Sequence, residues 1–248
     1  MIDGLYSEFL KLKRTGYYIT ILLVGLICLM FTTMNKQMVS SLNWYGYFFK
    51  FEFIAFGIFF TLVIPNIIAI IFVREFRYKT APIEFSYPNG RFGALINKFL
   101  MSIIVVAIIY GISYILVILG GVIFLKTPLT TEPLINHFKI FTISFVFQVA
   151  LTPLAILIAL IGKSMIISLI YSMVLITGNA HYLLESKYSD YIFSILPASP
   201  IAKLRTTVCQ VPIPVNMVIS NSDIYLGIFI FIIGVVGCIL FYRKANIY

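Results

Sequence analysis

The triplet Gly162-Lys163-Ser164 is the first candidate for chemistry, because a phosphate-binding P-loop ends in the same three residues. A P-loop also carries a glycine five positions earlier, where this chain has Leu157. The residues before the triplet form a long apolar run instead of the short strand that precedes a P-loop. We therefore interpret Gly162 and Lys163 as a tight cytoplasmic turn whose lysine reaches lipid headgroups.

The other side chains that could do chemistry are widely scattered. The chain has no His-Glu-x-x-His helix and no Gly-x-Ser-x-Gly elbow, and its histidines are His137 and His181. Neither histidine has a carboxylate or cysteine at ligand spacing, so we expect both at the membrane interface without a metal. Cys28, Cys209 and Cys238 do not make a disulfide framework. The sequence predicts no catalytic residue and no metal site.

A dense group of charges, "REFRYKT" at Arg74–Thr80, separates two very apolar runs. Thr80 can cap a short helix, whose first turn tolerates Pro82 and favours the negative charge of Glu84. We expect this helix to lie just beneath the membrane, within a cytoplasmic loop over residues 74–98.

The composition shows which solvent surrounds most of the chain. Of 248 residues, 61% are hydrophobic and 11% charged, and the mean hydropathy is +1.03. This leaves too little polar surface to coat a soluble globule, so membrane lipid is the expected partner. The formal net charge of +9 would suggest nucleic acid in a soluble protein. In a membrane protein it is a topology signal near anionic headgroups, and we expect no nucleic-acid partner.

Six apolar runs are long enough to cross a hydrocarbon core of about 30 Å as helices. Lys and Arg are denser in the segments that share a side with the N-terminus, which predicts N-in and C-in topology. The predicted fold class is therefore all-α integral membrane, with one transmembrane domain over residues 1–248. The spans are expected near 17–34, 53–73, 99–125, 140–161, 164–184 and 223–242, with an outer re-entrant-like segment at 185–222.

The first 16 residues predict an amphipathic interfacial helix. Ile2, Leu5, Phe9 and Leu12 share one face, opposite a polar face. A frayed basic tail is the alternative. The residues expected to carry the contacts of this helix are Phe9, Lys11, Lys13 and Arg14.

No Asp, Glu, Lys or Arg falls near the middle of a predicted span, which argues against ion-coupled transport. Asn66, Gln148 and Tyr171 are candidates for lining a translocation path, but each can equally form a hydrogen bond with a neighbouring helix. A path lined mainly by aliphatic and aromatic side chains suits an amphipathic or lipid-like cargo.

Several short motifs stand in a fixed order around the first cytoplasmic loop and before the last span. They are Ser7–Arg14, Glu75, Thr80, Pro88, Arg91, Lys98 and Leu196–Pro200. In these motifs and in its six spans the chain resembles the permease subunits of type-2 ATP-binding-cassette (ABC) exporters. Within this family, the chain most resembles the permeases of lantibiotic immunity, bacitracin resistance and peptide export. Lys79 departs from the pattern, since members often have glycine there.

The resemblance implies a non-catalytic permease of the bacterial plasma membrane, without a cofactor of its own. Separate cytoplasmic ATPase subunits would bind ATP and Mg²⁺, and a second permease chain, identical or a sister subunit, would complete the path. The short helix near Thr80 would be the coupling helix that docks on the ATPase, braced by the N-terminal helix. The residues expected to carry this coupling are Glu75, Arg77, Lys79, Thr80, Ile83 and Glu84.

Two other functions remain open at this point. One is a membrane scaffold or sensor subunit that transports nothing. The other is an intramembrane enzyme that modifies lipids, for which only the region Asp190–Arg205 offers polar groups.

Overall fold

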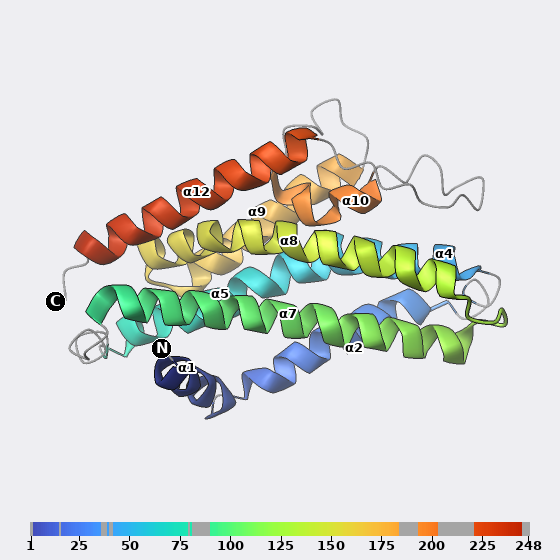
Figure 1. The fold of residues 1–248 in the computed structure, drawn as a ribbon, viewed down its shortest axis with the longest axis horizontal. Helices are drawn as coiled ribbons and strands as arrows, with labels where there is room; N and C mark the ends of the chain where they lie inside the picture. Colours follow the sequence, from blue (N-terminus) through green and yellow to red (C-terminus); the bar gives the residue numbers. More distant parts are fainter. Residues whose placement is uncertain are drawn as a thin grey trace.

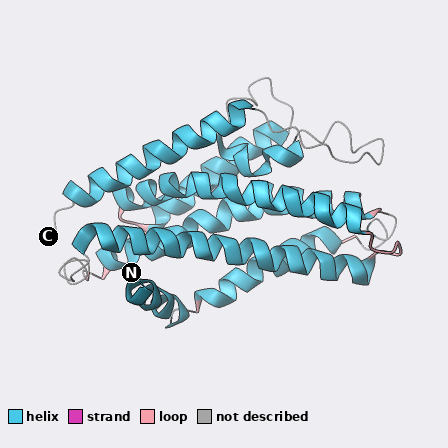
Figure 2. Cartoon of the chain, in the orientation of Figure 1, coloured by secondary structure: helices cyan, strands magenta, loops and turns pink. Residues whose placement is uncertain are grey.

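The computed structural model describes residues 2–14, 16–35, 39, 42–78, 80, 90–183, 193–202 and 221–244. Every regular element in this part of the chain is a helix, and the long helices run side by side in an elongated bundle (Figures 1 and 2). The elements are α1 (Ile2–Arg14), α2 (Tyr17–Thr33), α4 (Trp44–Ile54), the π-helical turn η1 (Ala55–Phe59), α5 (Phe60–Arg77), α7 (Gly90–Phe124), α8 (Thr131–Gly162), α9 (Met165–Leu183), the 3₁₀ turn η3 (Phe193–Ala198), α10 (Ser199–Ala202) and α12 (Asn221–Lys244).

Four described helices are long and apolar enough to cross a membrane: Trp44–Arg77, Gly90–Phe124, Thr131–Gly162 and Asn221–Arg243. The bent pair α1–α2 makes a fifth candidate, with an angle of 66° between its two parts. The apolar part of α9, Met165–Asn179, is shorter than these. The all-α membrane fold is confirmed, whereas six spans and the N-in orientation stay predictions.

Three helices begin more than two turns before the predicted spans. The spans expected from residues 53, 99 and 140 begin at Trp44, Gly90 and Thr131. The hydropathy pattern marks where a helix becomes continuously apolar, and a helix whose first turns carry polar residues starts before that point. The predicted cytoplasmic loop 74–98 is therefore too long, because its last residues, from Gly90, belong to α7.

Aromatic side chains fill the centre of the bundle. Phe56 and Phe60 pack on Tyr110 of α7, with ring centroids 5.5 and 4.8 Å apart, and Phe56 also lies 5.0 Å from Phe141 of α8. These four side chains are buried. They hold α5 against α7 and α8 by burying large apolar area and by edge and stacking contacts.

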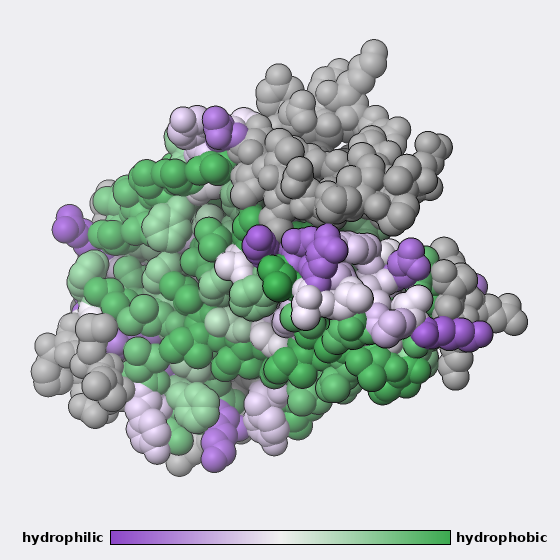
Figure 3. Space-filling view, turned by 45° about the vertical axis from the view of Figure 1, so that its right-hand side comes forward, coloured by the Kyte–Doolittle hydropathy of each residue, from purple (hydrophilic) through white to green (hydrophobic). Residues whose placement is uncertain are grey.

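The outer faces of the helices are apolar as well, and Figure 3 shows hydrophobic residues over most of the described surface on the side drawn. Leu22 of α2, Met173 of α9 and Phe229 of α12 are among the many exposed large hydrophobic residues. A soluble monomer rarely exposes so large an apolar surface. This surface fits a protein surrounded by lipid tails.

The helices α8 and α12 lie unusually close together. A Cβ atom on Gly234 would stand 2.7 Å from the backbone of Pro153 and Leu154. Cys238 Sγ, one turn further along α12, donates to the carbonyl oxygen of Pro153 at 3.4 Å. Small residues at this crossing let two backbones meet, as in other membrane helix pairs.

Candidate functional site

The helix α1 lies against the ends of α5 and α7, at the end of the bundle where α5 stops and α7 starts (Figure 1). Its predicted apolar face is divided: Leu5 and Leu12 pack on the protein core, whereas Phe9 is 49% exposed. Glu8, on the inner side, is buried. The face of α1 that packs against the protein therefore carries a charged side chain, Glu8, beside the two leucines.

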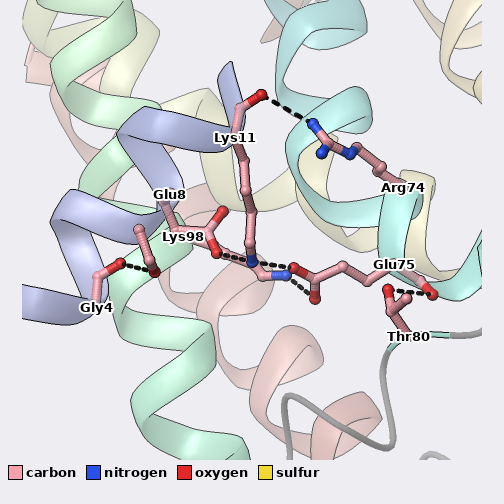
Figure 4. A network of polar contacts seen from close by, with 8 residues as sticks. Gly4, Glu8, Lys11, Arg74, Glu75, Thr80 and Lys98 are labelled. Atoms are coloured by element: carbon pink, nitrogen blue, oxygen red, sulfur yellow. Dashed lines mark hydrogen bonds and ion pairs between the residues drawn. The ribbon is translucent and has the colours of Figure 1, made fainter. Parts of the chain in front are cut away.

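Glu75, in the last turns of α5, is the centre of an ion-pair network at this end (Figure 4). Its Oε1 accepts from Lys11 Nζ of α1 at 2.7 Å, and its Oε2 pairs with Lys98 Nζ of α7. Lys11 Nζ also pairs with Glu8 Oε1 at 2.6 Å. Because the four side chains come from three helices, the network ties α1, α5 and α7 together.

Because much of this network is buried, its charged groups need partners of opposite charge. Lys98 is 1% exposed, and Glu75 and Glu8 are also buried. Partial desolvation lowers the pKa of Lys11, but hydrogen bonds and charges of Glu75 and Glu8 raise it further, and the net pKa lies above 10.5. A buried charge that loses its partner is strongly destabilising, so each of these cations holds the network in place.

Backbone groups around the end of α5 join the same contact region. Arg74 donates through Nη1 to the carbonyl oxygen of Lys11 at 3.1 Å. The backbone N–H of Thr80 donates to the carbonyl oxygen of Glu75 at 2.9 Å, with its hydroxyl 3.5 Å from the same atom. Thr80 thus closes the C-terminal end of α5. Its predicted role as the cap of a following helix lies outside the described residues.

The six residues predicted for coupling have different outcomes. Glu75 points into the protein and not toward the loop, since it is buried among α1 and α7. Arg77 is exposed, and its Nη1 lies 3.9 Å from Met165 Sδ at the start of α9. Lys79, Ile83 and Glu84 lie outside the described residues, as does the side chain of Arg14 in α1. Lys13 is exposed on α1.

The candidate path residues Gln148 and Tyr171 meet at one pocket between α5, α8, α9 and η3. Its empty space, including the open mouth, is about 270 Å³, and its walls are Thr61, Pro65, Gln148, Leu151, Ala155, Tyr171, Leu175 and Pro197. Tyr171 Oη has no hydrogen-bond partner among the described residues. The lining carries hydroxyl and amide groups and no charge.

Asn66, the third path candidate, joins two helices. Its Nδ2 donates to Leu62 O of its own helix at 2.7 Å and to Ser172 Oγ of α9 at 3.0 Å. Asn66 is not among the residues that line the pocket beside Gln148 and Tyr171. In this conformation, Asn66 therefore fits the alternative of a hydrogen bond to a neighbouring helix.

Two side chains of α9 donate to backbone carbonyl oxygens at irregular points of the helix Trp44–Arg77, the π-helical turn and Pro65. In the π-helical turn, Gly57 O accepts from Asn179 Nδ2 at 2.9 Å. At Pro65, which interrupts the hydrogen bonding of the same long helix, Ser168 Oγ of α9 donates to the carbonyl oxygen of Pro65 at 3.0 Å. The α5–α9 contact is therefore a polar seam beside the pocket.

A second buried polar pair, Glu52 of α4 and His137 of α8, was missed by the sequence reasoning. Glu52 Oε1 lies 2.7 Å from His137 Nδ1, and the imidazole stacks on Phe48 with centroids 4.6 Å apart. Both side chains are buried inside the bundle, and the interfacial depth expected for His137 stays a prediction. The predicted spans began at residues 53 and 140, which left this pair just outside the helices. A carboxylate in an apolar helix needs a partner, and this was the signal available in the sequence.

Comparison with protein families matches residues 4–179 to the family described as "ABC-2 family transporter protein". A comparison with curated proteins gives no match. The family match runs from α1 to α9 and includes Glu8, Lys11, Glu75 and Lys98, the four residues of the ion-pair network. Because this match covers well over half of the chain, the chain belongs to the ABC-2 family of transporter proteins and is a multi-pass membrane protein of the permease type.

Proposed function

We propose that this permease subunit exports an amphipathic or hydrophobic cargo, such as an antimicrobial peptide, from the membrane or the cell. Separate ATPase subunits, which bind ATP and Mg²⁺, supply the energy, and a second permease chain, identical or a sister subunit, completes the path. The observation that carries the proposal is the ion-pair network around Glu75, which joins the end of α5 to α1 and α7.

The position of this network suits the transmission of movement. Glu75 lies in the last turn of the helix Trp44–Arg77, directly before the segment for which we predict the ATPase contact. A push on that segment moves the end of α5, and through Lys11 and Lys98 it also moves α1 and α7. Buried, hydrogen-bonded ion pairs have defined geometry, so the three helix ends move as a unit.

The chemistry of the pocket supports the proposed cargo class. Gln148 and Tyr171 offer uncharged hydrogen-bonding groups among apolar walls that include Leu151 and Leu175. A charged solute would lose its hydration there without gaining an opposite charge. An amphipathic molecule with amide or hydroxyl groups meets fewer such costs.

The test is a pull-down from native membranes with a tagged full-length chain, followed by an ATPase assay of the recovered complex. We expect an ATPase to co-purify and its hydrolysis to rise with an amphipathic peptide. We expect Glu75→Gln to lower this stimulation by about tenfold while ATPase recovery persists, because the variant loosens the link between the helix ends. Glu132→Gln changes an exposed acid at the start of α8 and serves as the matched control.

Two results would contradict the proposal. Failure to recover an ATPase in several mild detergents would argue against an ATP-driven complex. If an ATPase is recovered but its rate of ATP hydrolysis does not change with any amphipathic peptide tested, the result would favour the scaffold or sensor subunit instead.

A further inference from the structure

We propose that the groove between α1 and α5 binds the headgroup of one anionic phospholipid and that this lipid holds α1 in place. The groove is lined by Glu8, Lys11, Leu12, Ile70, Ile71, Arg74 and Glu75. It has about 250 Å³ of empty space, including its open mouth. It lies apart from the pocket at Gln148 and Tyr171, and its assignment does not depend on transport.

The charges around the groove favour an anion. The lining itself carries two cations, Lys11 and Arg74, and two carboxylates, Glu8 and Glu75. Lys98 is not part of the lining, but it pairs with Glu75 Oε2 and adds a third cation, which leaves one positive charge in excess. Both carboxylates are engaged by lysine, Glu8 by Lys11 and Glu75 by Lys11 and Lys98. The excess charge therefore falls on Arg74.

Arg74 uses only part of its N–H donors in its hydrogen bond with a described residue. Its hydrogen bond is to a neutral backbone oxygen, Lys11 O, at 3.1 Å, and no described carboxylate pairs with it. A guanidinium carries five N–H donors in a planar fork that matches two oxygens of a phosphate. A lipid phosphate would supply both the negative charge and the acceptors that this side chain lacks.

The remaining walls of the groove suit a lipid better than a free anion. Leu12, Ile70 and Ile71 present apolar surface beside the guanidinium, which fits the glycerol and upper acyl chain of a phospholipid. Phe9 and Leu10, on the other side of α1, are exposed, as expected for a helix lying at the depth of the headgroups. Arg74 stands in the last turn of a membrane-length helix, the usual depth of a lipid phosphate.

The experiment uses the purified full chain in nanodiscs of phosphatidylcholine, with and without a minor fraction of phosphatidylglycerol. We expect phosphatidylglycerol to raise the thermal midpoint and one molecule to remain bound in native mass spectrometry after transfer to detergent. Arg74→Gln should lower this retention by about fivefold, the factor that one cation near an anionic lipid contributes. Arg77→Gln, which removes an exposed arginine one turn away, should leave it unchanged.

Several outcomes would overturn the assignment. Equal losses of bound phosphatidylglycerol in Arg74→Gln and Arg77→Gln would show diffuse attraction to anionic lipid. Equal retention of phosphatidylcholine would show that the charge of the headgroup does not determine binding. The same midpoint shift with inorganic phosphate would assign the groove to a free anion. Because Arg74→Gln also removes a contact to α1, the comparison of headgroups on the unchanged chain tests the proposal independently of that variant.

Discussion

Replacing Glu75 by Gln tests the ion-pair network most directly. Glu75 is the acid shared by Lys11 and Lys98, and Lys98 is 1% exposed. The substitution keeps the size of the side chain and leaves a buried ammonium without its carboxylate. Removing one partner from a buried ion pair costs about 3–5 kcal/mol, so we expect the free energy of unfolding of the purified chain to fall by this amount.

A second substitution separates loss of charge pairing from loss of packing. Lys98→Met removes the buried cation while filling a similar volume, and a buried pair replaced by neutral groups is often close to neutral in stability. We therefore expect Glu75→Gln with Lys98→Met to recover most of the stability that Glu75→Gln alone loses. Glu132→Gln, at an exposed position, should change stability by less than about 0.5 kcal/mol.

The assay has two readouts. Unfolding in mixed micelles gives the free-energy difference, and limited trypsin cleavage after Lys13, which is exposed on α1, reports release of that helix. Faster cleavage in Glu75→Gln is expected, with slower cleavage again in the double variant. A cost below about 1 kcal/mol, or a double variant no better than the single one, would refute the reasoning.

Three further predictions concern the packing of α8 on α12, the pair Glu52–His137 and the pH dependence of the Lys11 contacts. Gly234→Ala should cost about 1–3 kcal/mol in unfolding assays, because the new methyl group meets the backbone of α8. Gly111→Ala, with nothing within 4 Å of the added methyl group, should be neutral or stabilising, and equal effects would contradict the close α8–α12 approach. His137→Leu should cost about 3–5 kcal/mol by leaving the Glu52 carboxylate buried alone, and Glu52→Gln about 1–3 kcal/mol; thermal unfolding that ranks them in the opposite order would contradict this pairing. The raised pKa of Lys11 means that its stabilising contribution is complete below pH 10.5 and is lost as pH rises through the folded pKa. The stability difference between the unchanged chain and Lys11→Met should therefore stay constant from about pH 6 to pH 9, and a difference that disappears within that range would contradict it.

The apolar runs predicted the helices well because lipid imposes a length and a composition on any segment that crosses it. They failed at helix starts such as Trp44 and Thr131, because polar residues in the first turns interrupt hydropathy without interrupting the helix. The family resemblance depended on short motifs, and the match over residues 4–179 confirmed the family and left the cargo untested.

The site was less predictable, since its contacts join residues far apart in sequence. Nothing in the spacing of Glu8, Glu75 and Lys98 shows that α1, α5 and α7 converge, although Glu75 and Lys98 were identified through the resemblance. Glu52 and His137 likewise stand 85 positions apart. Only the rule that a buried charge needs a partner points to such pairs, and it does not say which partner is used.

The seam between α5 and α9 has a consequence for how these helices can slide. Ser168 and Ser172 stand one helical turn apart, so a slide of α9 by about 5.4 Å could place Ser172 opposite Pro65 O, where Ser168 now donates. The same slide would carry Asn179 one turn away from Gly57 O, to which its side chain now donates. The two serines thus tolerate two registers, and Asn179 is the residue that distinguishes them.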